Sequence, residues 1–140
     1  MKHLFLLLLS VFGLGSPDTE TVDLEIVVTN IKTQKGSIEL GVFNKPKSFL
    51  KKGKEYKVYS QKVSSDTVIF HLKDYKKNDY AISIYHDINS DNECNLNFLG
   101  IPVEPYGFSR NFKPKLSKPS FNDCKIDAFE DKSVNIALIH

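Results

Sequence analysis

The chain has no tryptophan, only two cysteines and only one methionine among its 140 residues. The lack of tryptophan disfavours a carbohydrate-stacking platform, although tyrosine and phenylalanine could serve in its place. The chain also lacks a large excess of charge, because its formal net charge is +2. Overall charge therefore gives no indication of a nucleic-acid partner. A phosphate-binding P-loop pattern is absent as well.

Long apolar runs are lacking except at the N-terminus. Leu4 to Leu14 is an apolar stretch behind a short basic segment, and Gly13 and Gly15 are small residues at the −3 and −1 positions of a cut after residue 15. This pattern predicts a secretory signal peptide over residues 1–15 and one domain over residues 16–140, in a periplasmic or secreted protein. An uncleaved N-terminal anchor is the alternative, and no later segment could span a membrane.

The two cysteines are Cys94 and Cys124. Export permits a disulfide, and even cysteine numbers in exported chains usually pair. A bridge would close a loop of roughly 30 residues and stabilise the fold by about 3–4 kcal/mol in the chain-entropy model. The alternative is two separate free thiols.

The dominant hydrophobic period is two, which is typical of half-buried strands. Five segments show it clearly: Val22–Val28, Ile38–Val42, Val68–Leu72, Tyr80–Ile84 and Val134–Leu138. Weaker strands are expected at Tyr56–Val63 and Lys125–Phe129. The pattern predicts an all-β fold, a single antiparallel Ig-like or transthyretin-like sandwich of about seven strands.

The connections carry three local predictions. Lys32–Gly36 has the composition of a hairpin turn, and Phe43–Leu50 is expected to include a short helix. Tyr80, entering the fifth strand, is either a tyrosine corner of the kind found in Ig-like sandwiches or a plain core residue.

A long excursion follows the fifth strand. From Asp87 to Asp123 there is little strand signal, and four prolines interrupt the segment. Loops of this length are usually functional or disordered. Five aromatic residues favour an ordered, packed excursion: Phe98, Tyr106, Phe108, Phe112 and Phe121.

The start of this excursion has oxygen-bearing side chains at every second position, as in loops that wrap a calcium ion. Asn92 stands where such a loop needs a residue that tolerates positive φ. A carboxylate is missing at position 12, which is Phe98, and Glu104 is the candidate to replace it. The alternative is a bare Asx-rich turn. The predicted metal ligands are Asp87, Asn89, Asp91, the backbone carbonyl of Glu93, Asn95 and Glu104.

The same excursion resembles a known family. The motifs are His86-Asp87-x-Asn89-x-Asp91, then Asn97-Phe98-Leu99-Gly100-Ile101-Pro102-x-Glu104-x-Tyr106-Gly107-Phe108-Ser109-x-Asn111, then Pro119-Ser120-Phe121-x-Asp123. Together they resemble the exported bacterial proteins catalogued as domain of unknown function 2141. The resemblance covers most of the chain and implies a small periplasmic or secreted β-sandwich, with no established activity.

The chain departs from the family loop, which commonly reads HDENGNGKLDTN. Asp91 adds a carboxylate, Asn92 replaces a glycine, and Asn95 removes an acid, so the net ligand charge is about the same. Cys94 and Cys124 occupy positions that are apolar or small in the family, and a disulfide would be a local addition.

The leading functional hypothesis is a non-catalytic binding or accessory module for an envelope protein or glycan. Calcium would order the excursion, which would present Tyr106, Phe108 and Phe112 to the partner. Another hypothesis is a purely structural or assembly subunit. A lysine-rich stretch could dock an anionic partner such as a lipid headgroup or an acidic polysaccharide, or be a solvated loop. Its lysines are Lys45, Lys47, Lys51, Lys52, Lys54 and Lys57.

An envelope hydrolase is the alternative from the enzyme class. His86 beside Asp87 could act as a base, with Ser109 as nucleophile in a triad-like set, but no nucleophile-elbow sequence surrounds Ser109. Asp87 and Glu104 could also form an acid pair for glycoside hydrolysis. A structural His86 and cation-ligating carboxylates are the simpler interpretations, so no catalytic residue is assigned.

Overall fold

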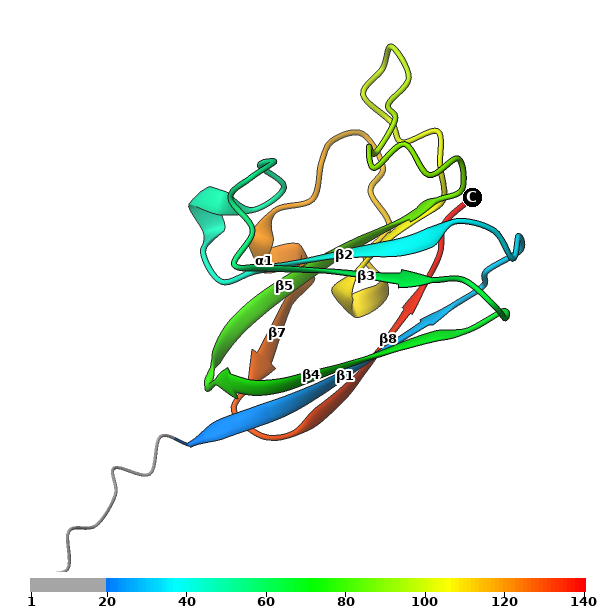
Figure 1. Cartoon of the computed structure of the whole chain (residues 1–140). Helices are drawn as coiled ribbons and strands as arrows, with labels where there is room; N and C mark the ends of the chain where they lie inside the picture. The colour runs from blue at the N-terminus through cyan, green and yellow to red at the C-terminus, as the bar shows by residue number, and fades with distance from the viewer. Residues whose placement is uncertain (1–19) are drawn as a thin grey trace, which may run out of the picture.

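Residues 20–140 form an all-β structure of two packed sheets in the computed structural model of the protein (Figure 1). The signal peptide predicted for residues 1–15 lies outside these described residues. No helix of the described part has the length and hydropathy to cross a membrane.

The first sheet has three strands in the order β4-β1-β8. They are β1 (Thr21–Thr29), β4 (Val68–Lys76) and β8 (Lys132–Ala137). β1 runs antiparallel to β4 and parallel to β8, so that Ile26 is paired with Phe70 on one side and Val134 on the other. The prediction of a purely antiparallel sandwich is therefore wrong for the β1–β8 pair.

The second sheet has five strands, all antiparallel, with the order β3-β2-β5-β6. They are β2 (Ser37–Phe43), β3 (Lys57–Lys62), β5 (Asn78–Asp87), β6 (Tyr106–Phe108) and β7 (Lys125–Ala128). β7 also pairs with β5, at its start, whereas β6 pairs nearer its end. The structure thus has eight strands rather than about seven, because β6 lies inside the predicted excursion.

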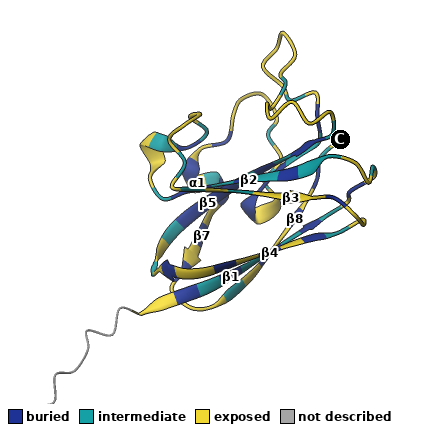
Figure 2. Ribbon diagram, in the orientation of Figure 1, coloured by how far each residue is buried: buried dark blue, intermediate teal, exposed yellow. Residues whose placement is uncertain are grey.

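The main core fills the space between the sheets. On β5 the alternate residues Tyr80, Ile82 and Ile84 point inward and are nearly inaccessible to solvent (Figure 2). The hydroxyl of Tyr80 donates to the main-chain carbonyl of Lys76 at 2.7 Å, which is the contact of a tyrosine corner. The two-sheet all-β architecture is confirmed, and the Ig-like classification stays a prediction.

The Lys32–Gly36 segment does not form the predicted hairpin. β1 and β2 belong to different sheets, so this segment crosses from one sheet to the other. The expected short helix is found as the 3₁₀ turn η1 (Pro46–Ser48).

The excursion is ordered by a second apolar cluster on the outer face of the five-stranded sheet. The rings of Phe43, Phe49 and Phe121 make edge-to-face contacts, with centroids 5.3 Å and 6.0 Å apart. Phe121 opens the short helix α1 (Phe121–Cys124), whose N-terminus is closed by a Ser120–Asp123 capping box. The loops 44–56, 88–105 and 112–120 rise on this outer side of the sheet (top of Figure 1), and we call them together the loop face.

Candidate metal centre

Asp87 is the last residue of β5 and anchors the loop that follows. Strand alternation places it on the outer face of the sheet, opposite the inward-pointing His86. Its side chain is fully buried and accepts the N–H groups of Asp91 at 3.2 Å and Asn92 at 2.9 Å. These bonds curl the chain around the carboxylate, and Asn89 forms an Asx turn by accepting the N–H of Asp91 at 3.3 Å.

The turn requires two left-handed residues. Ser90 has φ 58° and Asn92 has φ 60°, and Asn is among the non-glycine residues that adopt this region most readily. Asn92 therefore has the backbone conformation that was predicted for it.

Asp91 is held by three donors on the solvent side of the loop. The side-chain amides of Asn95 and Asn89 donate to one carboxylate oxygen at 2.7 Å and 3.1 Å, and the N–H of Glu93 donates to the other at 2.9 Å. These hydrogen bonds, that of Asn95 first, lower the pKa of Asp91. Asp91 therefore stays ionised in mildly acidic solution.

Glu104 enters from the far end of the excursion, just before β6. One oxygen accepts the N–H of Ile88 at 3.1 Å. The other, Oε2, has no hydrogen-bond partner among the described residues. Water cannot readily replace that partner, because the residue is only 9% exposed. Burial, followed by repulsion from Asp87 and Asp91, raises the pKa of Glu104.

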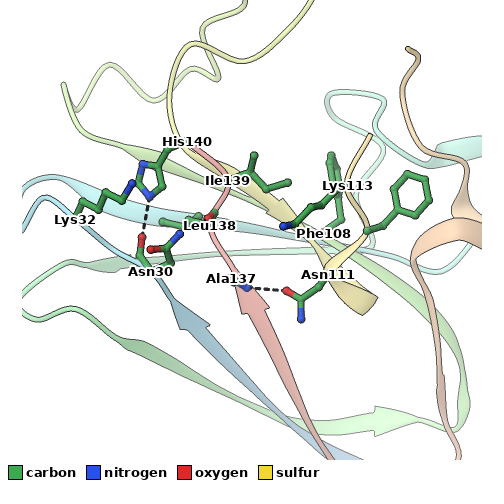
Figure 3. Close-up of a pocket in the computed structure, with 10 residues that line it drawn as sticks. Asn30, Lys32, Phe108, Asn111, Lys113, Ala137, Leu138, Ile139 and His140 are labelled. Carbon is green, nitrogen blue, oxygen red and sulfur yellow. Dashed lines mark hydrogen bonds between the residues drawn. The ribbon is translucent and has the colours of Figure 1, made fainter. Parts of the chain in front are cut away.

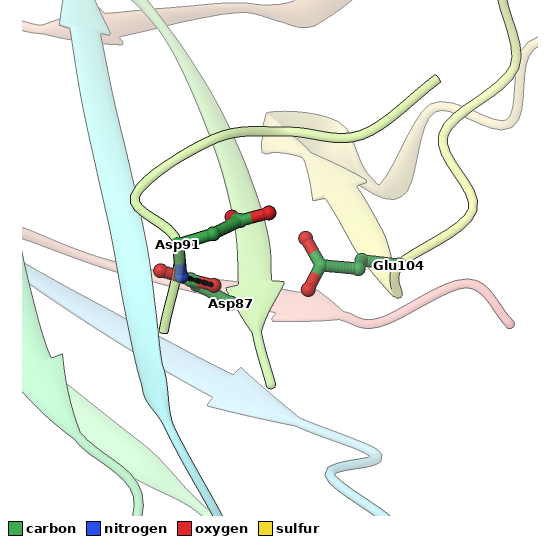
Figure 4. Close-up of side chains that lie close together, drawn as sticks. All are labelled: Asp87, Asp91 and Glu104. Carbon is green, nitrogen blue, oxygen red and sulfur yellow. Dashed lines mark hydrogen bonds between the residues drawn. The ribbon is translucent and has the colours of Figure 1, made fainter. Parts of the chain in front are cut away.

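These three carboxylates converge on one point (Figure 4). Asp87, Asp91 and Glu104 each offer an oxygen, and the three oxygens lie within 4.8 Å of one another. Hard oxygen donors in an irregular cage are the ligand type that calcium prefers. The unpartnered Oε2 of Glu104 fits a cation, since a buried carboxylate oxygen without a donor is otherwise costly.

The family comparison agrees with the resemblance carried by the motifs. Residues 26–137 match the model of a family described as uncharacterised proteins conserved in bacteria, domain of unknown function 2141. The chain belongs to this family. No curated protein and no solved structure matches this chain.

Of the remaining predicted ligands, Asn89 and Asn95 lie beside the carboxylate cluster, whereas the side chain of Glu93 points away from it. Asn89 and Asn95 contact Asp91 through their amide groups, and rotating either amide by 180° would turn its oxygen toward the carboxylates. The exposed side chain of Glu93 instead points to Lys52, with 3.9 Å between the charged atoms. Only its backbone carbonyl stays a predicted ligand.

The triad-like set is separated, because Ser109 bonds Ile82, four residues before His86 on β5. Only the possible acid pair, Asp87 and Glu104, comes together, in the carboxylate cluster. His86 is completely buried, and its Nε2 donates to the carbonyl of Lys35 at 2.6 Å. Ser109 is also completely buried: its hydroxyl accepts the N–H of Ile82 at 2.9 Å and donates to the carbonyl of Cys124. Neither side chain is available to a substrate, so the triad-like set does not form.

The aromatic residues predicted to meet a partner are largely interior. Phe108 is buried in the outer-face cluster, and Tyr106 and Phe112 pack against it partly buried. The strongly exposed apolar side chains of the excursion are instead Leu96, Phe98, Leu99, Ile101, Val103 and Leu116. Sequence reasoning missed them, although the run of apolar residues from Leu96 to Val103, without a period of two, was a visible signal.

The two cysteines are both free, so the predicted disulfide is not formed in the structure. Cys94 lies exposed on the loop, whereas Cys124 is buried at the end of α1 within the aromatic cluster. The packing of Cys124 inside this cluster, away from the exposed loop that carries Cys94, separates the two thiols.

A cavity of about 460 Å³ lies near the C-terminal end of β8 (Figure 3). At the wall of this cavity, the side-chain oxygen of Asn111 accepts the N–H of Ala137 at 2.8 Å. The ring of His140 donates to the carbonyl of Asn30, also at 2.8 Å. Phe108 and Phe112 line it, but the three clustered carboxylates do not. The cavity is therefore separate from the candidate metal centre.

Proposed function

We propose that this protein is a non-catalytic binding module of the cell envelope whose Asp87–Glu104 segment holds a calcium ion. The observation that carries the proposal is the convergence of three carboxylates around a buried, unpartnered Glu104 oxygen. Three like charges this close repel one another, and a divalent cation removes the repulsion. The amide and carbonyl oxygens of the loop favour calcium over magnesium, which demands a stricter octahedron.

The cation would fix the part of the excursion that reaches a partner. Asn95, which contacts Asp91, also accepts the N–H of Val103 at 2.8 Å through its main-chain carbonyl. A small hairpin therefore begins at the candidate site and carries Leu96, Phe98 and Leu99 outward. Ordering its base would present these side chains in one conformation, which is how preorganisation increases affinity.

An assembly role through strand addition has weaker support. β3 is the outer strand of its sheet, but it is short and has Lys57 and Lys62 at its two ends. Short, lysine-bearing edge strands resist pairing with another chain.

Calorimetric titration of calcium into the protein tests the proposal. The expected result is saturable binding that weakens at least about tenfold in Asp91→Ala, since a charged ligand is lost. Asp66→Ala is the matched control, because Asp66 is an exposed aspartate in the turn before β4. An absence of binding, with loop 88–105 equally sensitive to protease in calcium and in chelator, would overturn the proposal.

A further inference from the structure

The hairpin above the candidate metal centre ends in an exposed apolar tip. Phe98 is 96% exposed and Leu99 is 68% exposed. The tip is not a collapsed loop: the side-chain oxygen of Asn97 accepts the N–H groups of Leu99 at 2.9 Å and Ile101 at 3.0 Å. Gly100, with φ +75°, completes the turn. The fold thus holds two large apolar side chains out in water.

Other apolar side chains extend this feature over the loop face. Leu96, Ile101 and Val103 are exposed on the same hairpin, and Leu116 is fully exposed on loop 112–120. We call Leu96, Phe98, Leu99, Ile101 and Val103 the apolar tip. Exposed apolar groups that cluster in this way mark an interaction site more often than isolated ones do.

Exposed lysines lie on the loops beside the base of this hairpin. Loops 44–56 and 112–120 carry eight lysines and one glutamate. The Lys52–Glu93 contact of 3.9 Å joins the first loop to the base of the hairpin, and the Phe49–Phe121 ring contact ties it to the segment after the second. The exposed lysines are Lys45, Lys47, Lys51, Lys52, Lys54, Lys113, Lys115 and Lys118.

From this arrangement we infer that the loop face docks on an anionic lipid bilayer. Phe98 and Leu99 enter the boundary between headgroups and acyl chains, and the lysines contact lipid phosphates. An apolar projection flanked by basic side chains is the pattern of interfacial membrane binding, in which hydrophobic burial and electrostatic attraction add. The charge complementarity selects an anionic surface over a neutral one.

The lipid bilayer is then the partner of the proposed binding module, and the calcium dependence of docking rests on that proposed function. Asp87, Asp91, Glu93 and Glu104 place negative charge at the base of the hairpin, and this charge opposes approach to an anionic surface. A bound calcium ion offsets it. Docking is therefore expected to be tighter with calcium than with chelator.

Vesicle sedimentation tests the inference. The protein is mixed with vesicles of phosphatidylglycerol and phosphatidylcholine, or of phosphatidylcholine alone, in calcium or in chelator. We expect binding to the anionic vesicles, tighter in calcium, and a loss of about tenfold or more in Phe98→Ser/Leu99→Ser. Val58→Ser is the matched control, since Val58 is 68% exposed on β3, outside the loop face. Lys51→Gln/Lys52→Gln is expected to weaken binding by about 25-fold, from about fivefold for each lysine.

The possible outcomes separate the two proposals. Calcium binding by calorimetry without anionic vesicle binding overturns the docking inference and leaves the metal site standing. Vesicle binding that is equal in chelator, with no calcium uptake, supports docking and overturns the metal site. Equal binding of the wild type and the Phe98→Ser/Leu99→Ser variant to anionic vesicles overturns membrane insertion. Equal binding to neutral vesicles overturns the selection for anionic lipid.

Discussion

The backbone of Gly36 lies directly against the main-chain carbonyl of Asp87. A β-carbon at position 36 would lie only 1.9 Å from that oxygen, and Gly36 has φ +67°. Both facts require glycine: side chains disfavour this φ, and no space is left for one. The segment between β1 and β2 therefore fixes the backbone on which the candidate metal centre is built.

Gly36→Ala is expected to destabilise the protein by roughly 2–4 kcal/mol, combining left-handed strain with a backbone clash. Gly53→Ala is the matched control, because Gly53 has φ +78° but no described atom within 4 Å of the added carbon. Its loss should be only about 1–2 kcal/mol. Urea unfolding of both variants measures the difference, and equal losses would contradict the close contact.

Ser109→Ala is expected to destabilise the fold by about 1–3 kcal/mol, because it leaves the buried N–H of Ile82 without the acceptor that Ser109 provides. Calcium binding should be unchanged, since Ser109 lies outside the carboxylate cluster. Thermal unfolding and calcium titration together check this structural role. A hydrolytic activity abolished in a folded Ser109→Ala protein would instead support the nucleophile hypothesis.

Much of the sheet structure was predictable because five strands carry a clear period of two and two more carry a weaker one. The strand β6 was not, since three residues containing Gly107 are too short to show a period. The Lys32–Gly36 turn was misread because turn composition reports a change of direction but not the sheet in which the next strand pairs. The parallel β1–β8 pairing joins distant segments and leaves no local pattern.

The candidate site was likewise predictable only in part. The alternate spacing of Asp87, Asn89 and Asp91 was visible in the sequence, and Glu104 could be named as the missing carboxylate because few acids follow the loop. Burial could not be read from the sequence. The excursion folds back, and this hides Phe108 and leaves Phe98 exposed, which is the reverse of the expected use of the aromatic residues.

Thiol labelling of the native protein is expected to modify one cysteine. Cys94 is exposed, whereas Cys124 is buried, and burial raises the pKa of the Cys124 thiol to about 12. Alkylation followed by mass spectrometry should show one label in native buffer and two in denaturant. An exported, unreduced sample that takes no label even in denaturant would show that the disulfide forms after all.

Calcium affinity is expected to fall in mildly acidic solution. Burial and the neighbouring carboxylates raise the pKa of Glu104, so this ligand takes up a proton at a higher pH than an ordinary glutamate. Below that raised pKa, protons compete with calcium, and affinity should drop by up to about tenfold per pH unit. Titrations at several pH values measure the profile. Glu93→Gln, which alters an exposed side chain, should leave it unchanged, and a profile flat down to the ordinary range of glutamate would contradict the prediction.

The most direct measurement for the metal centre is the melting temperature of the wild type and Glu104→Gln, in calcium and in chelator. Burial raises the pKa of Glu104, which means that the fold disfavours the ionised carboxylate. In chelator and at a pH above that raised pKa, the ionised carboxylate therefore destabilises the fold. The neutral variant should then be more stable at pH 7, by about 1–2 kcal/mol. In calcium the order should reverse, because binding to the native state stabilises the wild type. If the two proteins respond identically to calcium, or if neither responds, the carboxylate cluster is not a calcium site.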